Sequence, residues 1–455
     1  MTEPDGETGG LRARAGGAMT APSVPLRRGW RAVFEYARSP VMASVAQISA
    51  GNLAVLAIQV ATGFLMARWV APYDMGVWNT VSIVLVYAPF LTLGVFSGLN
   101  RELPYLVGRG LGEEARGMAE AAYGWAVALA AVTCPAVLVV TAWFFARGQA
   151  KLAWAALALG VTAFFWWFSA YLGTTYRTHH EFGRLARNNT IVALVGVVLM
   201  LLVRQYGFHG MLVRAALLGF LAVAALHFRR PIPVRPRWGT ARLVSLVKVG
   251  VPIYILGQLS ALQGSLDRVF LMQSTHALGL YTLALQAGTA ASLVPNSFST
   301  VVYPRMAQRY GETQRAGGLW VLAAKASLAA SALGAAVGIA GWVATRYVVE
   351  WFLPNYVSGI RAAQWASFLG LAMGLYVFNN IFNIIKRQDL YLIGWSVGIA
   401  GYWAAWKLLT RAPGADLTVA AAQAMLVSTF LFSLVSVGTS WWACAAHDRR
   451  AARVG

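Results

Sequence analysis

Charged residues are scarce in this chain. They occupy 12% of its 455 positions, about half the share expected of a soluble globular protein. Acidic residues are the scarcest, with 16 Asp and Glu against 37 Lys and Arg, and the net charge is +21. No segment is polar enough to form a nucleic-acid-binding domain, so we expect no nucleic-acid partner. Basic loops beside an anionic membrane surface explain the charge better.

Cysteine is nearly absent as well. Cys134 and Cys444 both fall in apolar segments, which excludes a disulfide framework and argues against a thiolate metal site. We therefore expect neither a metal nor another cofactor. Apolar sequence begins only near Val41, so no cleavable signal peptide is predicted.

Motifs for catalysis are also missing. The six aspartates include no Asp-x-Asp pair of the kind that holds a metal in membrane glycosyltransferases. The chain has no phosphate-cradling P-loop and no plausible set of nucleophile, histidine and acid. A large outer loop, usual in polymerases and ligases, is absent too. We predict that the protein is not an enzyme, and a membrane glycosyltransferase, polymerase or ligase remains a minor alternative.

Long apolar runs dominate the chain, because hydrophobic residues make up 58% of it. A spanning helix needs about 20 mostly apolar residues. Twelve segments qualify, and we predict an all-α polytopic membrane protein with these spans: 45–66, 78–99, 119–143, 152–172, 188–203, 210–226, 249–270, 280–303, 319–341, 362–383, 389–409 and 417–443.

The loops differ in charge according to side. With the amino terminus inside, about 26 of the 37 Lys and Arg fall in inner segments. The positive-inside rule then places both termini in the cytoplasm. The connection 227–248 illustrates the bias with five Arg and one Lys, whereas the outer turn 144–151 holds only Arg147 and Lys151.

The basic, proline-rich connection also divides the chain into halves with six spans each. We predict a cytoplasmic tail (1–40, partly disordered), a first bundle (41–226), a basic cytoplasmic linker (227–248), a second bundle (249–443) and a carboxyl tail (444–455). Both bundles begin inside, so any repeat is parallel.

Matching residues stand at the ends of equivalent spans in the two halves. Arg68 ends the first span and Gly76 precedes the second, while Arg268 ends the seventh span and Gly279 precedes the eighth. Pro104 and Pro304 stand at the inner ends of the second and eighth spans. The shared order supports an internal repeat.

The same stretches carry a family resemblance. Residues 66–76 (MARWVAPYDMG) resemble the first outer turn of bacterial polysaccharide (O-antigen-type) flippases, and 351–356 (WFLPNY) resemble a later aromatic turn of that family. The second-half pattern is similar at 267–270, 278–281 and 304–307. Ala71, where a glycine is common, and Trp78, where a smaller residue is common, depart from the pattern. The family belongs to the multidrug/oligosaccharidyl-lipid/polysaccharide exporter superfamily.

This resemblance implies two six-helix bundles around a central cavity, working by alternating access. The implied cargo is a lipid-linked oligosaccharide on an isoprenoid pyrophosphate, flipped from the cytoplasmic to the outer leaflet of a bacterial inner membrane for surface polysaccharide synthesis. Further implied partners are membrane lipids and the polysaccharide polymerase or export proteins, and we expect a monomer. A multidrug exporter of the same superfamily is the main alternative, although a cationic cargo would favour carboxylates in the cavity and candidate arginines outnumber acids near the spans.

Fixed cations are the candidates for holding the pyrophosphate, since a guanidinium matches phosphate oxygens. Arg68 and Arg268 would face each other near the outer ends of equivalent spans if the repeat is real, with Asp267 orienting Arg268 or titrating. Snorkelling to headgroups is the competing interpretation for the arginines, and a local ion pair for the aspartate. Lys325, about two turns inside the ninth span, could also snorkel.

Amide side chains follow helical faces and could bind sugar hydroxyls. Their spacings of seven or four residues place each pair on one side of its helix. The candidates are Asn52 and Gln59 in the first span, Gln263 with Asp267 in the seventh, and Asn379 and Asn383 in the tenth. Hydrogen bonding between helices within a bundle is the alternative role.

Overall fold

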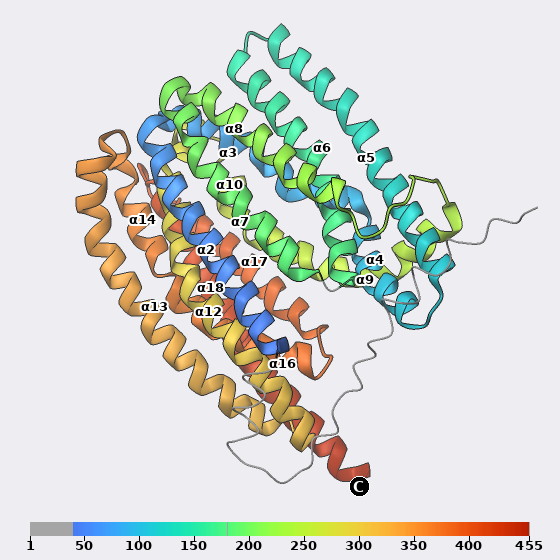
Figure 1. Ribbon diagram of the computed structural model, residues 1–455. Coiled ribbons are helices and arrows are strands. Elements are labelled where there is room, and N and C mark those ends of the chain that lie inside the picture. The colour runs from blue at the N-terminus through green and yellow to red at the C-terminus, as the bar shows by residue number, and fades with distance from the viewer. Residues whose placement is uncertain (1–39, 180, 455) are drawn as a thin grey trace, which may run out of the picture. The chain divides into compact units, whose positions relative to one another are not determined.

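The computed structural model describes residues 40–179 and 181–454, and the contacts given below are those of the body that begins at Gln47. The predicted tail, except its last residue, and a short basic helix expected within 27–38 lie outside the described residues. Helices joined by short turns account for the fold, and no strand occurs in these residues (Figure 1).

The first six predicted spans correspond to helices in chain order. They are α2 (Pro40–Trp69), α3 (Pro72–Tyr87) with the 3₁₀ turn η1 (Ala88–Thr92) and α4 (Val95–Gly108), α5 (Gly112–Ala146), α6 (Ala150–Thr178), α7 (Phe182–Val198) and α8 (Met200–Phe228).

The second six follow in the same order. They are α9 (Thr240–Gln263), followed by the short α10 (Leu266–Leu271) and α11 (Thr275–Leu280); α12 (Thr282–Thr313); α13 (Gly317–Phe352); a broken span; α17 (Leu390–Leu409); and α18 (Leu417–Val454). The broken span consists of η2 (Pro354–Gly359), α14 (Ile360–Ser367), α15 (Leu369–Met373), η3 (Gly374–Phe378) and α16 (Asn379–Ile384).

Nine segments of the described chain are long and apolar enough to cross a membrane, which supports the predicted membrane class. The other three predicted spans have individual reasons for falling short. The described apolar part of α2 is Leu53–Trp69, α7 has 17 residues, and α17 carries five Trp and Tyr side chains that lower its mean hydropathy.

The fifth and sixth spans meet at a sharp turn inside α8. Gly207 has φ 54° and ψ −124°, a conformation that a side chain would strain. Beyond it Gly210 packs against the carbonyl of Leu202, so the chain has reversed direction. The fifth span therefore comprises α7 and the first turns of α8, in agreement with the turn expected between 203 and 210.

The helices form two bundles. In the first half α6 contacts α5 and α8, α7 packs on α8, and α4 packs on α5; in the second half α13 contacts α12, α14 and α15, and α17 packs on α18. Figure 1 shows α5, α6 and α8 gathered on one side and α13 and α14 on the other. Trp167 and Tyr171 are buried in the first bundle, and Tyr402 and Trp406 in the second.

Hydrogen bonds at helix ends explain where α13 and α18 begin. Asp448, near the end of α18, accepts hydrogen bonds from the backbone N–H groups of Ala316 and Gly317 at 2.7 and 2.9 Å. Asp416 accepts from the N–H of Thr418 at 2.9 Å. Free N–H groups at a helix start need such acceptors. The first contact also ties the end of the chain to the start of α13.

Candidate functional site: the junction between the bundles

The start of α3 crosses α11 where the two halves meet, at the end of the bundles predicted to be outer. A Cβ atom at Gly76 would overlap the carbonyl oxygen of Thr275, and one at Gly279 would overlap that of Pro72. The two glycines lie 203 positions apart, as do Pro72 and Thr275. The crossing is thus two-fold symmetric, and each half contributes the same positions to it.

Hydrogen bonds reinforce this crossing. The Asn79 side-chain amide donates to the Thr282 hydroxyl at 2.8 Å, across the same offset of 203 residues, and to the carbonyl of Leu278 at 3.3 Å. Tyr356, after α13, donates to the carbonyl of Val70 at 2.9 Å. All these groups are buried, so the halves are joined at this end by a closed, hydrogen-bonded junction.

A second seam runs between α3–α4 and α9. Gly94 and Gly98 lie against the backbone of α9 at Gly250 and Leu246 respectively. Tyr87 is hydrogen-bonded to the Ser265 hydroxyl at 2.8 Å. Glycine on both helices permits this close antiparallel packing.

The second span is broken at this seam. Helix α3 ends at Tyr87, η1 covers Ala88–Thr92, and α4 starts at Val95 after Leu93 and Gly94, whose φ values are 48° and 76°. A break frees backbone groups that a continuous helix would satisfy, so it is tolerated at membrane depth only where protein or a cavity surrounds it. The expected span 78–99 is thus two helices separated by a turn.

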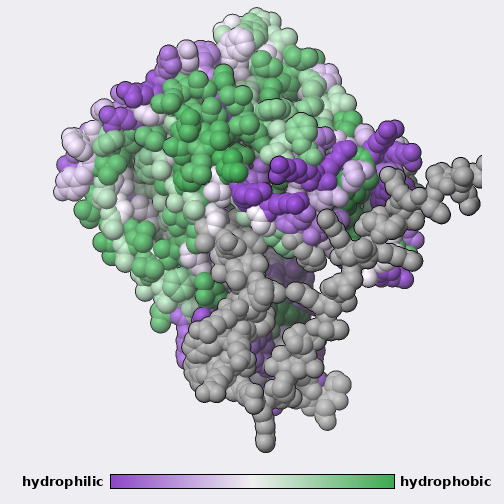
Figure 2. All heavy atoms as spheres, in the orientation of Figure 1, coloured by the Kyte–Doolittle hydropathy of each residue, from purple (hydrophilic) through white to green (hydrophobic). Residues whose placement is uncertain are grey.

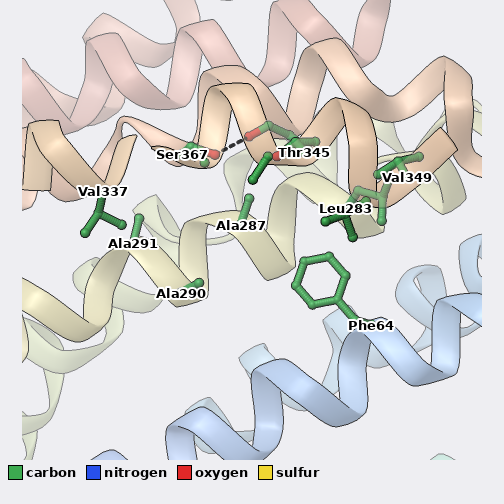
Figure 3. A pocket seen from close by; sticks show the side chains of 13 residues that line it. Phe64, Leu283, Ala287, Ala290, Ala291, Val337, Thr345, Val349 and Ser367 are labelled. Atoms are coloured by element: carbon green, nitrogen blue, oxygen red, sulfur yellow. Dashed lines mark hydrogen bonds between the residues drawn. The ribbon is translucent and has the colours of Figure 1, made fainter. Parts of the chain in front are cut away.

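An apolar cavity of about 250 Å³ is lined by α12, α13 and α14 of the second half, and Phe64 of α2 is the lining residue that the first half contributes. Phe64 of α2 points across it toward Leu283, Ala287 and Ala290 of α12, as Figure 3 shows. Helix α13 contributes Val337, Val348 and Val349 to the same wall. Its lining is almost entirely hydrocarbon, so it suits an apolar chain and not a sugar.

Arg68 is exposed at the end of α2, with its guanidinium 4.5 Å from the centre of the Phe352 ring at the end of α13. This cation–π contact reaches from the first half to the second. Gln59 is exposed on α2, whereas the side chain of Asn52 lies outside the described part of the chain.

Asp267 is buried within the second bundle, with 3% of its surface exposed. Its carboxylate accepts hydrogen bonds from the Tyr281 hydroxyl at 2.9 Å and from the backbone N–H of Arg268 at 2.7 Å. The Arg268 Nε lies 4.0 Å from the same carboxylate, and its Nη2 donates to the carbonyl of Gly264 at 3.3 Å. Gln263 is also buried and donates to the Ser428 hydroxyl at 2.7 Å.

The remaining candidates lie in different surroundings. Lys325 occupies an exposed stripe of α13 with Val321 and Leu328, a pattern typical of a surface that faces lipid. Asn383 is exposed and accepts a hydrogen bond from Gln388 at 3.2 Å, while the carbonyl of Asn379 accepts one from Tyr391. No contact recorded for the described residues brings these side chains to Arg68 or Asp267, so a single polar site is still a prediction.

Sequence reasoning missed the residues that join the halves. A single polar group in an apolar or aromatic segment gives no sequence signal, and this is the setting of Asn79, Thr282 and Tyr356. The matched glycines, Gly76 and Gly279, were the usable signal, since they mark the crossing at which these groups meet. No cluster of three His, Cys, Asp or Glu side chains that could hold a metal occurs in the described part of the chain.

No protein-family model matches this chain, and no curated protein matches it by sequence. Solved structures do. A mutant of a MATE transporter aligns at TM-score 0.63 and 15% identity, over 90% of this chain and 98% of that one. The lipid II flippase MurJ, in an inward closed conformation, aligns at TM-score 0.65 and 12% identity, over 88% of this chain and 90% of MurJ.

The fold is that of the MATE and MurJ transporters. An outward-facing multidrug resistance MATE transporter of the MOP superfamily also aligns, at TM-score 0.63 and 14% identity over 90% of this chain and 98% of that one. The predicted fold class, an all-helical polytopic membrane protein, is confirmed, whereas six helices in each bundle and a central cavity stay predictions. At 12–15% identity the likeness shows the MATE and MurJ fold alone, so the cargo is inferred from the residues of this chain.

Proposed function

We propose that this chain is a transporter that flips a lipid-linked oligosaccharide, carried on an isoprenoid pyrophosphate, from the cytoplasmic to the outer leaflet of a bacterial inner membrane. The transport cycle is alternating access, and the product serves surface polysaccharide synthesis. Enzymatic chemistry is not part of the proposal.

The apolar cavity between α2 and α12–α13 is the observation that carries this proposal. The sugars and phosphates of such a cargo cannot cross hydrocarbon, whereas its isoprenoid chain gains nothing from leaving it. A transporter for this cargo therefore needs an apolar gap between its bundles through which the chain can trail. Phe64, Leu283 and Ala290 line a gap of that kind.

The hydrogen-bonded junction supports alternating access. Closure at one end depends on glycine contacts and on three buried hydrogen bonds, from Asn79 to Thr282 and Leu278 and from Tyr356 to Val70. Rigid-body rotation of packed bundles can open and remake such contacts without refolding any helix. The geometry supports a state that is closed at the predicted outer end.

Arg68 and Arg268 remain the proposed phosphate-binding cations. Lys325, on the exposed stripe of α13, and Gln263, bonded to Ser428, are left out of the proposed site. Stacking on Phe352 uses the face of the Arg68 guanidinium and leaves its in-plane N–H groups able to donate. Asp267 would orient Arg268, because its carboxylate lies 4.0 Å from the Arg268 Nε and also accepts from the Arg268 backbone N–H.

A multidrug exporter is the second candidate, favoured by the MATE structures among the neighbours. A cationic drug would require carboxylates open to the cargo. Asp267 does not offer one, because it is buried and already engaged by Tyr281 and Arg268. This favours the anionic lipid-linked cargo.

Filling the cavity should block flipping. Ala290→Phe places a ring in the space that we assign to the isoprenoid chain, and we expect about tenfold slower flipping, equivalent to about 1.4 kcal/mol. The measurement is outward exposure of lipid-linked oligosaccharide in vesicles. Ala329→Phe, on an exposed face of α13, is the matched control and should flip normally. Unchanged flipping by Ala290→Phe would remove the cavity from the pathway, and efflux of a cationic dye without flipping would favour the exporter.

Labelling should establish the orientation of the bundles. In a background with Cys134→Ser and Cys444→Ser, Gln149→Cys lies in a predicted outer turn and Thr240→Cys at a predicted inner one; both positions are exposed. An impermeant thiol reagent added to intact cells should label Gln149→Cys and spare Thr240→Cys, because the basic connections stay inside. The opposite labelling would reverse the topology.

A further inference from the structure

The segment between α8 and α9 has no regular structure, yet it is held against α5. The backbone N–H of Arg237 donates to the carbonyl of Glu120 at 3.2 Å, and the carbonyl of Arg237 sits against Gly124. Val234 is buried in the core of the first bundle, together with Leu243 and Leu246 of α9. The basic segment is therefore a fixed surface feature.

One carboxylate lies at the centre of this surface. Glu120 is 3.6 Å from Arg116 and 3.8 Å from Arg237, and both arginine side chains are more than half exposed. Arg242 adds a third guanidinium, packed on Gly117 of α5. A single partly buried acid cannot neutralise three arginines, so the surface keeps a positive charge.

The positive charge extends along the segment. Residues 229–248 contain no acid, and their exposed basic side chains are Arg229, Arg235, Arg237, Arg242 and Lys248. Two further acids, Glu113 and Glu114, stand in the first turn of α5, about 10 Å from Glu120 along the helix. Figure 2 shows hydrophilic side chains gathered where Figure 1 places α4, α5 and α9.

Aromatic side chains accompany the arginines. Trp238 is 62% exposed and lies 5.8 Å, centre to centre, from Trp125 of α5; Phe228, at the end of α8, is 85% exposed. Tryptophan beside arginine at the end of a spanning helix is typical of the headgroup layer. The segment joins two membrane-crossing helices directly, which puts its cations within reach of lipid phosphates.

We propose that this surface, formed by Arg116, Arg235, Arg237, Trp238 and Arg242, binds the headgroups of anionic phospholipids. The arginines donate to phosphate oxygens while Trp238 inserts at the level of the ester groups. Bound lipid would brace the connection between the two bundles against α5. The inference does not depend on which cargo the protein carries.

Lipid binding by the purified full-length protein tests the proposal. Native mass spectrometry with phosphatidylglycerol should show at least about tenfold weaker binding for the triple variant Arg235→Gln, Arg237→Gln, Arg242→Gln, since each cation near the surface contributes about fivefold. Phosphatidylcholine should bind both proteins weakly. The control triple, Arg147→Gln, Arg361→Gln, Arg411→Gln, removes the same charge from exposed sites elsewhere and should bind like the wild type.

A second variant tests the proposal independently, in case the triple variant Arg235→Gln, Arg237→Gln, Arg242→Gln misfolds. Glu120→Gln removes the acid but keeps the backbone carbonyl that holds Arg237, so phosphatidylglycerol binding should tighten about two- to fivefold. Brominated phosphatidylglycerol should quench less of the tryptophan fluorescence in Trp238→Phe than in the wild type, whereas Trp441→Phe, at an exposed tryptophan elsewhere, should leave the Trp238 share of the quenching in place. Equal losses in the two triples, weaker binding by Glu120→Gln, or preferential binding of a short oligonucleotide would each overturn the assignment.

Discussion

Gly279→Ala should open the junction between the two bundles. The added methyl group would overlap the Pro72 carbonyl and approach the Gly76 amide, and neither backbone atom can turn away as a flexible side chain could. Overpacking of this kind costs about 1–3 kcal/mol, enough to shift a two-state equilibrium by about 5- to 150-fold. Gly76→Ala should act in the same direction, because its methyl group would overlap the Thr275 carbonyl.

Cross-linking measures this effect directly. Asn79→Cys with Thr282→Cys replaces a hydrogen-bonded pair of side chains, so oxidation should join the halves in the parent protein. The yield should fall sharply when Gly279→Ala is added, and transport should slow. Gly311→Ala, on α12 with open space around its Cβ, is the matched control and should leave the yield unchanged. An undiminished yield with Gly279→Ala would show that the crossing tolerates separation and does not close the junction.

Asp267→Ala should cost about 3–5 kcal/mol of folding stability. The substitution leaves the Tyr281 hydroxyl without its acceptor and the Arg268 guanidinium without the nearby carboxylate. Asp267→Asn keeps an acceptor for Tyr281 and should lose less. Glu350→Ala breaks a more exposed ion pair with Arg346 and should change stability by about 1 kcal/mol or less. Thermal unfolding of the purified proteins measures all three.

Transport by the asparagine variant separates a structural from a titrating carboxylate. The pH dependence of flipping should match the wild type if Asp267 acts only as an acceptor for Tyr281 and the Arg268 backbone. A shifted pH profile in protein of normal stability would instead assign Asp267 a protonation step in the cycle.

The features that the sequence predicted are those that depend on the local properties of each segment. Hydropathy is a property of each segment in contact with lipid, so it predicted twelve spans and their order before any contact was known. The matched glycines 203 positions apart reflect a repeat whose halves pack in the same way. The sequence did not predict the break at Leu93 and Gly94, because an apolar segment has the same hydropathy whether its backbone is continuous or bent.

Tertiary packing decided which polar groups meet. By sequence Asp267 and Gln263 shared one face of a continuous span, but the chain leaves α9 at Gln263 and enters α10, so Asp267 pairs with Tyr281 while Gln263 reaches Ser428. Asn79 and Tyr356 join the halves only because the helices cross at Gly76 and Gly279. The chain by itself determined the membrane class and the all-helical fold, since both follow from the solvation of single segments. The junction and the apolar cavity depended on helix crossings, and those arise from contacts between residues hundreds of positions apart.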